Sequence, residues 1–119
     1  MNNIIKKYKA LSQECRLRII HLLIKTETQL CICEMMDVLK KEQYHISRCL
    51  GILKDADLIE EDRDGRLLLY SLNKSDPVNS YLFETILKEK ETEQFILDLE
   101  ALNKRLALRS NGKVVVTYK

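Results

Sequence analysis

The stretch LCICEMMDVLKKEQYHISRCL, residues 30–50, decides the fold of this chain. Apolar side chains at helical spacing predict a short helix over 31–39, followed by a polar turn over 40–42. A second, longer helix is predicted over 43–56. A short helix, a short turn and a longer helix in this order indicate a helix-turn-helix.

A β-hairpin is predicted directly after this pair of helices. Two runs of strand-like sequence, 58–63 and 66–72, are separated by the pair Asp64-Gly65. An Asp-Gly pair between such runs is a strong short-range signal for a tight hairpin. A hairpin in this position forms the wing of a winged helix-turn-helix. The sequence therefore predicts a mainly α fold with a small β-hairpin wing.

Helical patterns flank this core on both sides. An amphipathic helix is predicted over 2–11, and Ser12 is a suitable N-cap for a strongly apolar second helix through 17–24. An Asp-Pro pair at 76–77 marks another helix start, and from 78 to about 108 the absence of Gly and Pro predicts one long helix. Such a helix has more apolar surface than a small domain covers, which predicts a homodimer through the terminal helices.

The bulk properties indicate a single soluble domain. The chain has 119 residues, a formal net charge of +2 and 45% hydrophobic residues, which are ordinary values for a globular domain. No apolar run spans a membrane and no signal peptide opens the chain, so a cytoplasmic location without membrane contact is expected. The predicted division is a winged-helix and dimerisation domain over 1–110 and a C-terminal tail over 111–119, in which 114–118 is strand-like.

The longer helix of the pair has side chains suited to DNA. Residues 43–54 include no acidic side chain, although both flanks are rich in Asp and Glu. In helix-turn-helix proteins the N-terminal end of this helix enters the major groove, where Gln and Arg make two-pronged contacts with base edges. The alternative is an ordinary solvated helix face. The side chains predicted to contact double-stranded DNA, on this helix and at the hairpin tip, are Gln43, Tyr44, His45, Ser47, Arg48, Lys54, Arg63 and Arg66.

The four cysteines are Cys15, Cys31, Cys33 and Cys49. A reducing compartment disfavours a disulfide framework, so metal or redox chemistry is the favoured interpretation and simple burial is the alternative. Cys31 and Cys33 stand at the start of the first helix of the pair, and side chains two residues apart in a regular helix point roughly 200° apart. Both sulfurs reach one ion only if the helix start unwinds. Ion binding would then change the shape of the helix-turn-helix.

Several segments together resemble the ArsR/SmtB family of dimeric winged-helix metal-sensing repressors, over about residues 8–73. One difference is that Glu14-Cys15 stands where the family usually has a Pro-Thr pair. The resembling segments are 10–20 (the N-terminal signature), 30–35 (the metal box), 45–50 and 53–59 (the recognition helix and its exit) and 63–66 (the wing).

The resemblance implies a repressor that leaves its operator when trivalent arsenic or antimony, the inducer, binds cysteine thiolates. Arsenic-responsive members carry a third cysteine where this chain has Met36, so a site at Cys31 and Cys33 lacks one ligand. Cys15, from the same chain or from the dimer partner, is the candidate third ligand. Its place at a helix start is expected to lower the pKa of its thiol. Cys49 is interpreted as a packing residue.

Three alternatives stay open. The same fold would sense cadmium or lead, softer divalent ions that prefer about four thiolates, if Cys15 and Cys49 converged on the other two. A thiol redox switch would oxidise Cys15 with Cys31 or Cys33. A constitutive DNA-binding module would have inert thiols. An enzyme is not expected, because the sequence has no recognisable nucleophile–base set, Gly-rich phosphate loop or paired-carboxylate cleft, and no constitutive cofactor is implied.

Overall fold

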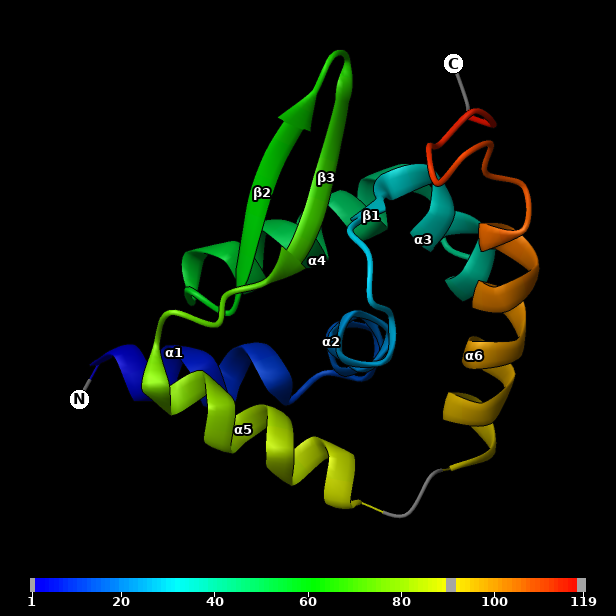
Figure 1. Cartoon of the computed structure of the whole chain (residues 1–119). Helices are drawn as coiled ribbons and strands as arrows, with labels where there is room; N and C mark the ends of the chain where they lie inside the picture. The colour runs from blue at the N-terminus through cyan, green and yellow to red at the C-terminus, as the bar shows by residue number, and fades with distance from the viewer. Residues whose placement is uncertain (1, 90–91, 118–119) are drawn as a thin grey trace.

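The computed structural model describes residues 2–89 and 92–117, and Figure 1 shows the order of their helices and strands. The elements are α1 (Asn2–Leu11), α2 (Glu14–Lys25), β1 (Leu30–Cys31), α3 (Ile32–Leu39), α4 (Gln43–Asp55), β2 (Ile59–Asp64), β3 (Leu67–Leu72), α5 (Pro77–Lys88) and α6 (Glu93–Leu106). The predicted winged helix-turn-helix is confirmed, with α3 and α4 as the helix pair and β2–β3 as the wing. Within these ranges, none of the helices has both the length and the apolar character needed to cross a bilayer.

Helix α2 lies at the centre of the domain, where Figure 1 looks along its axis. It packs against α1, α3, α4, α5 and α6. Its sequence explains this position, because Ile19, Ile20 and Leu22 are fully buried and a helix that is apolar nearly all round is stable only when neighbours cover it. His21 is buried too, and its ring stacks on Phe95 of α6 with 3.9 Å between the ring centroids.

The connection between α3 and α4 uses a left-handed backbone conformation although it holds no glycine. Lys40 closes α3 with φ 55° and ψ 50°, and its N–H donates a hydrogen bond to the carbonyl oxygen of Met36. A residue with a side chain adopts this conformation at a cost of roughly 1–2 kcal/mol. Glu42, with extended backbone, then precedes α4, so the chain reverses within a short turn that sets α4 against α3.

The sheet has the strand order β1-β3-β2, with antiparallel neighbours. Leu30 pairs with Tyr70 and Cys31 pairs with Leu69, so the residues before α3 form a short edge strand that the sequence pattern did not predict. The helix expected from residue 31 therefore begins at Ile32. Cys31 is at once the last residue of β1 and the N-cap of α3.

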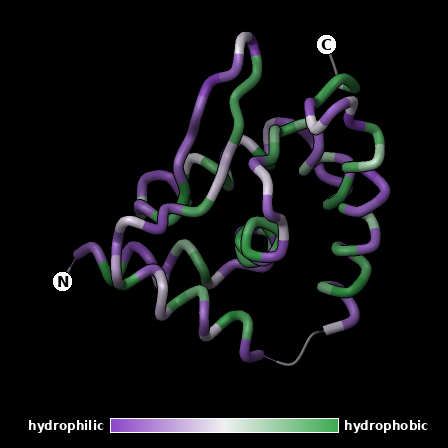
Figure 2. The backbone as a smooth tube through the Cα atoms, in the orientation of Figure 1, coloured by the Kyte–Doolittle hydropathy of each residue, from purple (hydrophilic) through white to green (hydrophobic). Residues whose placement is uncertain are grey.

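The wing is a hairpin with a two-residue loop, Gly65 and Arg66, between the paired residues Asp64 and Leu67. Gly65 has φ 63°, and a glycine with positive φ at the first loop position is typical of a type II′ turn. Figure 2 shows a hydrophilic β2 beside a hydrophobic β3, because β2 faces solvent along most of its length while β3 is at least half-buried. In Figure 1 the hairpin projects away from the helices, so its tip is free to meet a ligand.

The single helix expected from 78 to about 108 is wrong, because the structure has two helices, α5 and α6, in its place. Helix α5 ends at Lys88, and Thr92 caps α6 by accepting a hydrogen bond from the backbone N–H of Phe95 at 3.3 Å. No apolar residue occurs between Leu87 and Phe95. A continuous helix would have had no side chain to bury there, and tertiary packing is what stabilises most helices.

Two smaller expectations are also corrected. Ser12 does not cap α2; its hydroxyl donates to the carbonyl oxygen of Lys9 at 2.8 Å and so closes α1, while the side chain of Gln13 caps α2 by accepting from the N–H of Arg16 at 3.0 Å. The strand-like segment 114–118 forms no strand in its described part, which ends at residue 117.

Three ion pairs hold the C-terminal part of the chain against α2 and α3. Glu34 and Asp98 are fully buried, so separating either from its partner would leave an uncompensated charge in a medium of low dielectric constant. Helix α3, the first helix of the helix-turn-helix, is thereby tied to α6 and to the residues after it. The pairs are Arg18–Asp98 at 2.9 Å, Arg105–Asp37 at 2.6 Å and Arg109–Glu34 at 2.7 Å.

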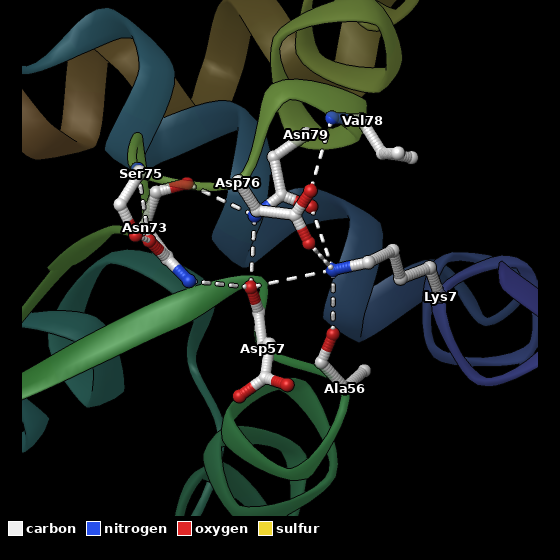
Figure 3. A network of polar contacts seen from close by, with 8 residues as sticks. All are labelled: Lys7, Ala56, Asp57, Asn73, Ser75, Asp76, Val78 and Asn79. Atoms are coloured by element: carbon white, nitrogen blue, oxygen red, sulfur yellow. Dashed lines mark hydrogen bonds and ion pairs between the residues drawn. The ribbon is translucent and has the colours of Figure 1, made fainter. Parts of the chain in front are cut away.

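A buried lysine joins α1 to the end of α4 and the start of α5 (Figure 3). The ammonium of Lys7 donates hydrogen bonds to the carbonyl oxygen of Ala56 at 2.9 Å and to the side-chain oxygen of Asn79 at 2.8 Å, and it pairs with Asp76 at 3.1 Å. Ala56 is the C-cap of α4, so the cation meets a helix end where carbonyl groups lack partners and the helix dipole is negative. Lys7, with help from the N–H of Val78, lowers the pKa of Asp76.

Candidate DNA interface and cysteine sites

Helix α4 has one buried face and one exposed face. The buried side chains, which pack into the core, are Ile46, Cys49, Leu50 and Leu53. The exposed side chains of the first turns are the predicted DNA contacts Gln43, Tyr44, His45, Ser47 and Arg48. The guanidinium of Arg48 lies 5.8 Å from the centroid of the Tyr44 ring, within cation–π range, which orients it along this face. The N-terminal part of α4 therefore offers polar, accessible side chains at the end expected to enter a groove.

Lys54, the predicted phosphate contact near the end of α4, is held by the wing. Its ammonium lies 2.9 Å from the carboxylate of Glu61 on β2, and that carboxylate also accepts a hydrogen bond from the hydroxyl of Tyr70 at 2.8 Å. Hydrogen bonds from Lys54 and then Tyr70 lower the pKa of Glu61, so the carboxylate is charged at neutral pH. A phosphate that binds Lys54 must compete with this carboxylate.

The wing has mixed charge. Arg63 on β2 and Arg66 in the loop are exposed, as the predicted contacts require. They stand among exposed carboxylates of the same strand, at Glu60, Asp62 and Asp64. Because phosphates repel these carboxylates, only the two arginines at the tip suit a contact with a DNA backbone.

Cys31 and Cys33 lie at the junction between the sheet and the helix-turn-helix. Cys31 is buried, and its backbone N–H donates to the carboxylate of Glu34 at 3.1 Å, which forms part of a capping box at the start of α3. Burial raises the pKa of the Cys31 thiol; the backbone N–H groups of Glu34 and Cys33 act against this. Cys33 is the second residue of α3 and is partly exposed, so a ligand would reach the pair from its side.

Glu34 connects this junction to the chain after α6. Besides the N–H of Cys31, its carboxylate accepts hydrogen bonds from Nε and Nη2 of Arg109, both at 2.7 Å. The guanidinium also donates to the side chain of Thr28 at 3.0 Å and to the carbonyl oxygen of Gln29 at 2.6 Å. One arginine thus contacts residues both before and after Cys31. Unwinding of the start of α3 has to break these hydrogen bonds.

Cys15 lies with Cys49 and His45, and not with Cys31 and Cys33 of the same chain. The ligand atoms of Cys15, His45 and Cys49 all lie within 4.8 Å of one another, and among the described residues this is the group of three or more such side chains that could hold a metal ion. Cys49, which the sequence interpretation assigned to packing, is buried but also contacts Cys15.

The expected low pKa of the Cys15 thiol is wrong. Burial raises this pKa to about 11, and the charge and hydrogen bond of Cys49 add to the effect, while Arg18 and Lys41 lower it. Cys15 does stand in the first turn of α2, where a helix dipole favours a thiolate, but the loss of solvent is the larger effect. In the ion-free protein at neutral pH Cys15 is therefore a thiol.

Comparison with known proteins places this arrangement in a family. The family described as bacterial regulatory protein, arsR family, matches residues 13–61, which run from the start of α2 into β2. The arsenical resistance operon repressor of Bacillus subtilis is 33% identical over 81 residues, which are 68% of this chain and 75% of that protein. The chain belongs to the ArsR family of bacterial regulatory proteins.

Other ArsR-family similarity includes cadmium regulators. The cadmium resistance transcriptional regulatory protein CadC of Listeria innocua is 31% identical over 72 residues, which are 60% of this chain and only 60% of that protein. A solved structure of Mb0332 from Mycobacterium bovis, described as a homodimeric winged helix-turn-helix DNA-binding domain, matches 72% of this chain and 76% of its own length, with a TM-score of 0.62 and 22% identity. That likeness shows the fold of this ArsR-family chain.

Sequence reasoning about this ArsR-family chain missed the partners of two cysteines. One signal was available, because His45 and Cys49 are four residues apart on a predicted helix and so lie on neighbouring turns of one face. The contribution of Cys15 depends on how α2 packs on α4, which no local pattern contains. Arg109, which holds Glu34, follows the last helix and gave no signal at all.

Proposed function

We propose that this chain is a homodimeric transcriptional repressor that leaves its operator DNA when trivalent arsenic or antimony binds Cys31 and Cys33. The arsenical resistance repressor among its relatives supports this inducer class. The observation that carries the proposal is the double position of Cys31, which ends the edge strand of the wing sheet and caps the first helix of the helix-turn-helix. An ion that moves Cys31 would act on α3, which packs on α4, and on β1, which pairs with β3 of the wing.

The proposed inducer reaction is ligand exchange. Arsenite has three hydroxyl groups on As(III), and each thiol that forms an As–S bond releases its proton to a departing hydroxyl, which leaves as water. The oxidation state of arsenic does not change. Cys31 has extended backbone at the N-cap of α3 and Cys33 lies in the first turn of that helix, so two bonds to one arsenic would draw the strand end and the helix start together and displace this junction. The displaced start of α3 would no longer support α4 in the DNA-bound position, so the ion favours the released state.

We propose that the third thiolate comes from Cys15 of a second copy. Within one chain Cys15 lies against Cys49, away from the pair on α3. A ligand from the partner would make the site span the dimer. Mixed dimers of a Cys15→Ser chain with a Cys31→Ser and Cys33→Ser chain test this assignment. They keep one complete site if Cys15 comes from the partner and none if it comes from the same chain.

The proposed DNA contacts follow the exposed side of α4 and the tip of the wing. The first turns of α4 would read base edges in the major groove, while the basic side chains farther along would contact phosphates. Base contacts are proposed for Gln43, His45 and Arg48. Phosphate contacts are proposed for Tyr44, Ser47, Lys54, Arg63 and Arg66.

The proposed dimer forms through the terminal helices. Large apolar side chains are exposed on them, including Tyr8 of α1 at 60% and Tyr81 of α5 at 73%, and a dimer interface would remove this apolar surface from water. The homodimeric state described for Mb0332, which has the same fold, supports a second copy as the partner. Two copies would also present two α4 helices to two half-sites of the operator.

A second candidate inducer is cadmium or lead, which the CadC relatives favour. These ions bind thiolates as arsenic does but prefer about four of them. The proposed DNA contacts and the proposed release from DNA are the same for both classes of inducer, and only the ion differs.

The deciding experiment is a fluorescence-anisotropy titration of the reduced full chain on the DNA upstream of its own coding sequence. Micromolar arsenite is expected to release the DNA, and Cys31→Ser and Cys33→Ser are each expected to abolish the release while binding DNA normally. Cys49→Ser, checked for unchanged circular dichroism because Cys49 is buried, is the matched control, since it removes a thiol outside the α3 pair. Release by cadmium or lead alone would replace the inducer, release by peroxide without metal would indicate a redox switch, and no response to any of them would contradict regulation by these thiols.

A further inference from the structure

Cys15, His45 and Cys49 form a second cluster of metal-ligating side chains, built between α2 and the recognition helix α4. Cys15 lies in the first turn of α2, and His45 and Cys49 lie one above the other on α4, four residues apart. The two helices pack directly on each other. Three ligands on two packed helices are held in place without help from a loop, which is the arrangement that defines a metal site well.

We propose that this cluster is a binding site for a thiophilic divalent cation of the zinc type, with the two sulfurs and the imidazole as protein ligands. The candidate atoms already lie within 4.8 Å of one another. In a tetrahedral zinc complex with Zn–S bonds near 2.3 Å, two sulfurs are about 3.8 Å apart. The candidate atoms therefore have to approach by about 1 Å at most between the sulfurs and by slightly more between a sulfur and the imidazole nitrogen, a change on the scale of side-chain rotation.

The burial of the three side chains suits an ion that enters from outside. Cys15 and Cys49 are 3% and 5% exposed, whereas His45 is exposed. The ion would arrive past the imidazole, and the fourth position would face solvent and hold water. Two thiolates balance a charge of +2, so no net charge is buried. Sulfur and imidazole ligands exclude magnesium and calcium, which prefer oxygen, and favour zinc or cadmium.

The site differs from the α3 pair in its consequence for DNA. His45 stands on the exposed face of α4 among the proposed base contacts. A bound ion holds the imidazole toward α2 and so removes it from that face. Because coupling between two ligands is reciprocal, the ion weakens DNA binding to the same extent that DNA weakens ion binding. This consequence rests on the proposed DNA interface, whereas the metal site itself does not.

Cobalt provides the test, since Co²⁺ takes zinc-like sites and absorbs in the near ultraviolet when thiolates bind it. The reduced full chain with Cys31→Ser and Cys33→Ser is titrated with Co²⁺, so that any thiolate absorption comes from the new cluster. One Co²⁺ per chain is expected. Adding His45→Gln is expected to weaken binding by more than about ten-fold, the loss that removing even an outer support of a metal ligand causes. Asp55→Asn, an exposed side chain at the far end of α4 and outside the cluster, is the matched control.

The exposed His45→Gln variant decides the outcome, because Cys49→Ser changes a buried side chain and is interpreted only if its circular dichroism is unchanged. No thiolate–cobalt absorption, or equal affinity with and without His45, overturns the proposal. Zinc that binds the cluster without weakening DNA binding overturns its regulatory consequence. The arsenite-induced release of DNA from the Cys49→Ser variant, in which Cys31 and Cys33 are intact, is measured separately. It reports on the α3 site alone, so failure of the α3 site and failure of the new site are distinguished.

Discussion

The carboxylate of Glu34 receives two hydrogen bonds of 2.7 Å from the guanidinium of Arg109, 75 residues farther along the chain. The same carboxylate accepts from the N–H of Cys31, so one buried charge connects the cysteine junction to the end of the domain. The pair therefore stabilises the start of α3 in its helical form, the form that the proposed ion binding at Cys31 and Cys33 would change.

Glu34→Gln is expected to lower the free energy of unfolding by about 3 kcal/mol, because it leaves the Arg109 guanidinium without its counter-charge in a buried place. Urea denaturation measures the loss. Arg109→Met should cost a similar amount, and the double variant should cost much less than the sum of the two single changes. Additive losses would mean that the two side chains do not act as a pair.

Lys7→Met is expected to destabilise the protein by about 2 to 4 kcal/mol, because the carbonyl of Ala56 and the side chain of Asn79 lose their buried donor. The pKa of Asp76, which Lys7 lowers, should return toward its ordinary value in an NMR titration. In the wild type this lowered pKa stabilises the fold above the ordinary aspartate pKa of about 3.9, and the stabilisation disappears as the pH falls through the lowered value. An unchanged Asp76 titration in Lys7→Met would contradict the pairing.

Glu61→Gln is expected to tighten DNA binding by about 1.4- to 5-fold, since it releases Lys54 from an exposed ion pair worth roughly 0.2–1 kcal/mol. Anisotropy at several salt concentrations measures this, and Lys54→Ala should lower the slope of log affinity against log salt by about one. Glu60→Gln is the control, because it removes the same charge from the same strand without releasing Lys54. Equal gains from both variants would assign the effect to general charge instead of to Lys54.

The reduced, metal-free protein is expected to lose stability as the pH rises from about 9 to about 11. The pKa of Cys15 is about 11 in the folded protein and near 9.0 when unfolded, so over this range the unfolded chain loses its thiol proton first and is favoured. Below pH 9 both states hold the proton and this contribution is complete. Urea denaturation from pH 7 upward, with Cys15→Ser as comparison, measures it, and the variant should show a smaller loss. If the wild type and Cys15→Ser lose stability in parallel as the pH rises, the alkaline sensitivity comes from a group other than Cys15.

Lys40→Gly is expected to raise the free energy of unfolding by up to about 1 kcal/mol, because glycine adopts φ 55° without strain, although it adds freedom to the unfolded chain. Lys40→Val should lower it, since a β-branched side chain fits this conformation poorly. Thermal unfolding of the three proteins gives the order, and a Val variant as stable as the Gly variant would show that the backbone here relaxes.

The helix-turn-helix and the wing could be predicted because their signals are local. Apolar spacing in α3 and α4 and the Asp64-Gly65 pair all act within a few residues. The division between α5 and α6 left a weaker mark, a gap in apolar side chains before Phe95 and a threonine suited to capping. A prediction that ends helices only at Gly or Pro therefore misses this division.

The cysteine sites were less predictable because their partners are distant in sequence. The doublet Cys31 and Cys33 is visible in one motif, but its edge strand exists only because β3 lies beside it. The contact between Cys15 and Cys49 requires α2 to lie against α4, and burial then reverses the pKa expected from the helix start. Local patterns describe which residues are present, and packing determines how a titrating group behaves.

Because β1 and α3 share the junction at Cys31, a displacement there has two separable outputs. One passes along α3 and its turn to α4, and the other passes through the pairing of Leu30 with Tyr70 to the wing. A substitution that loosens the pairing of β1 with β3 would leave the proposed contact of α4 with the major groove responsive to the inducer, while the wing stays bound to the DNA. Such a protein would give a graded response in place of full release, so under the proposed mechanism the length of this short strand would set how sharply the two contacts are lost together.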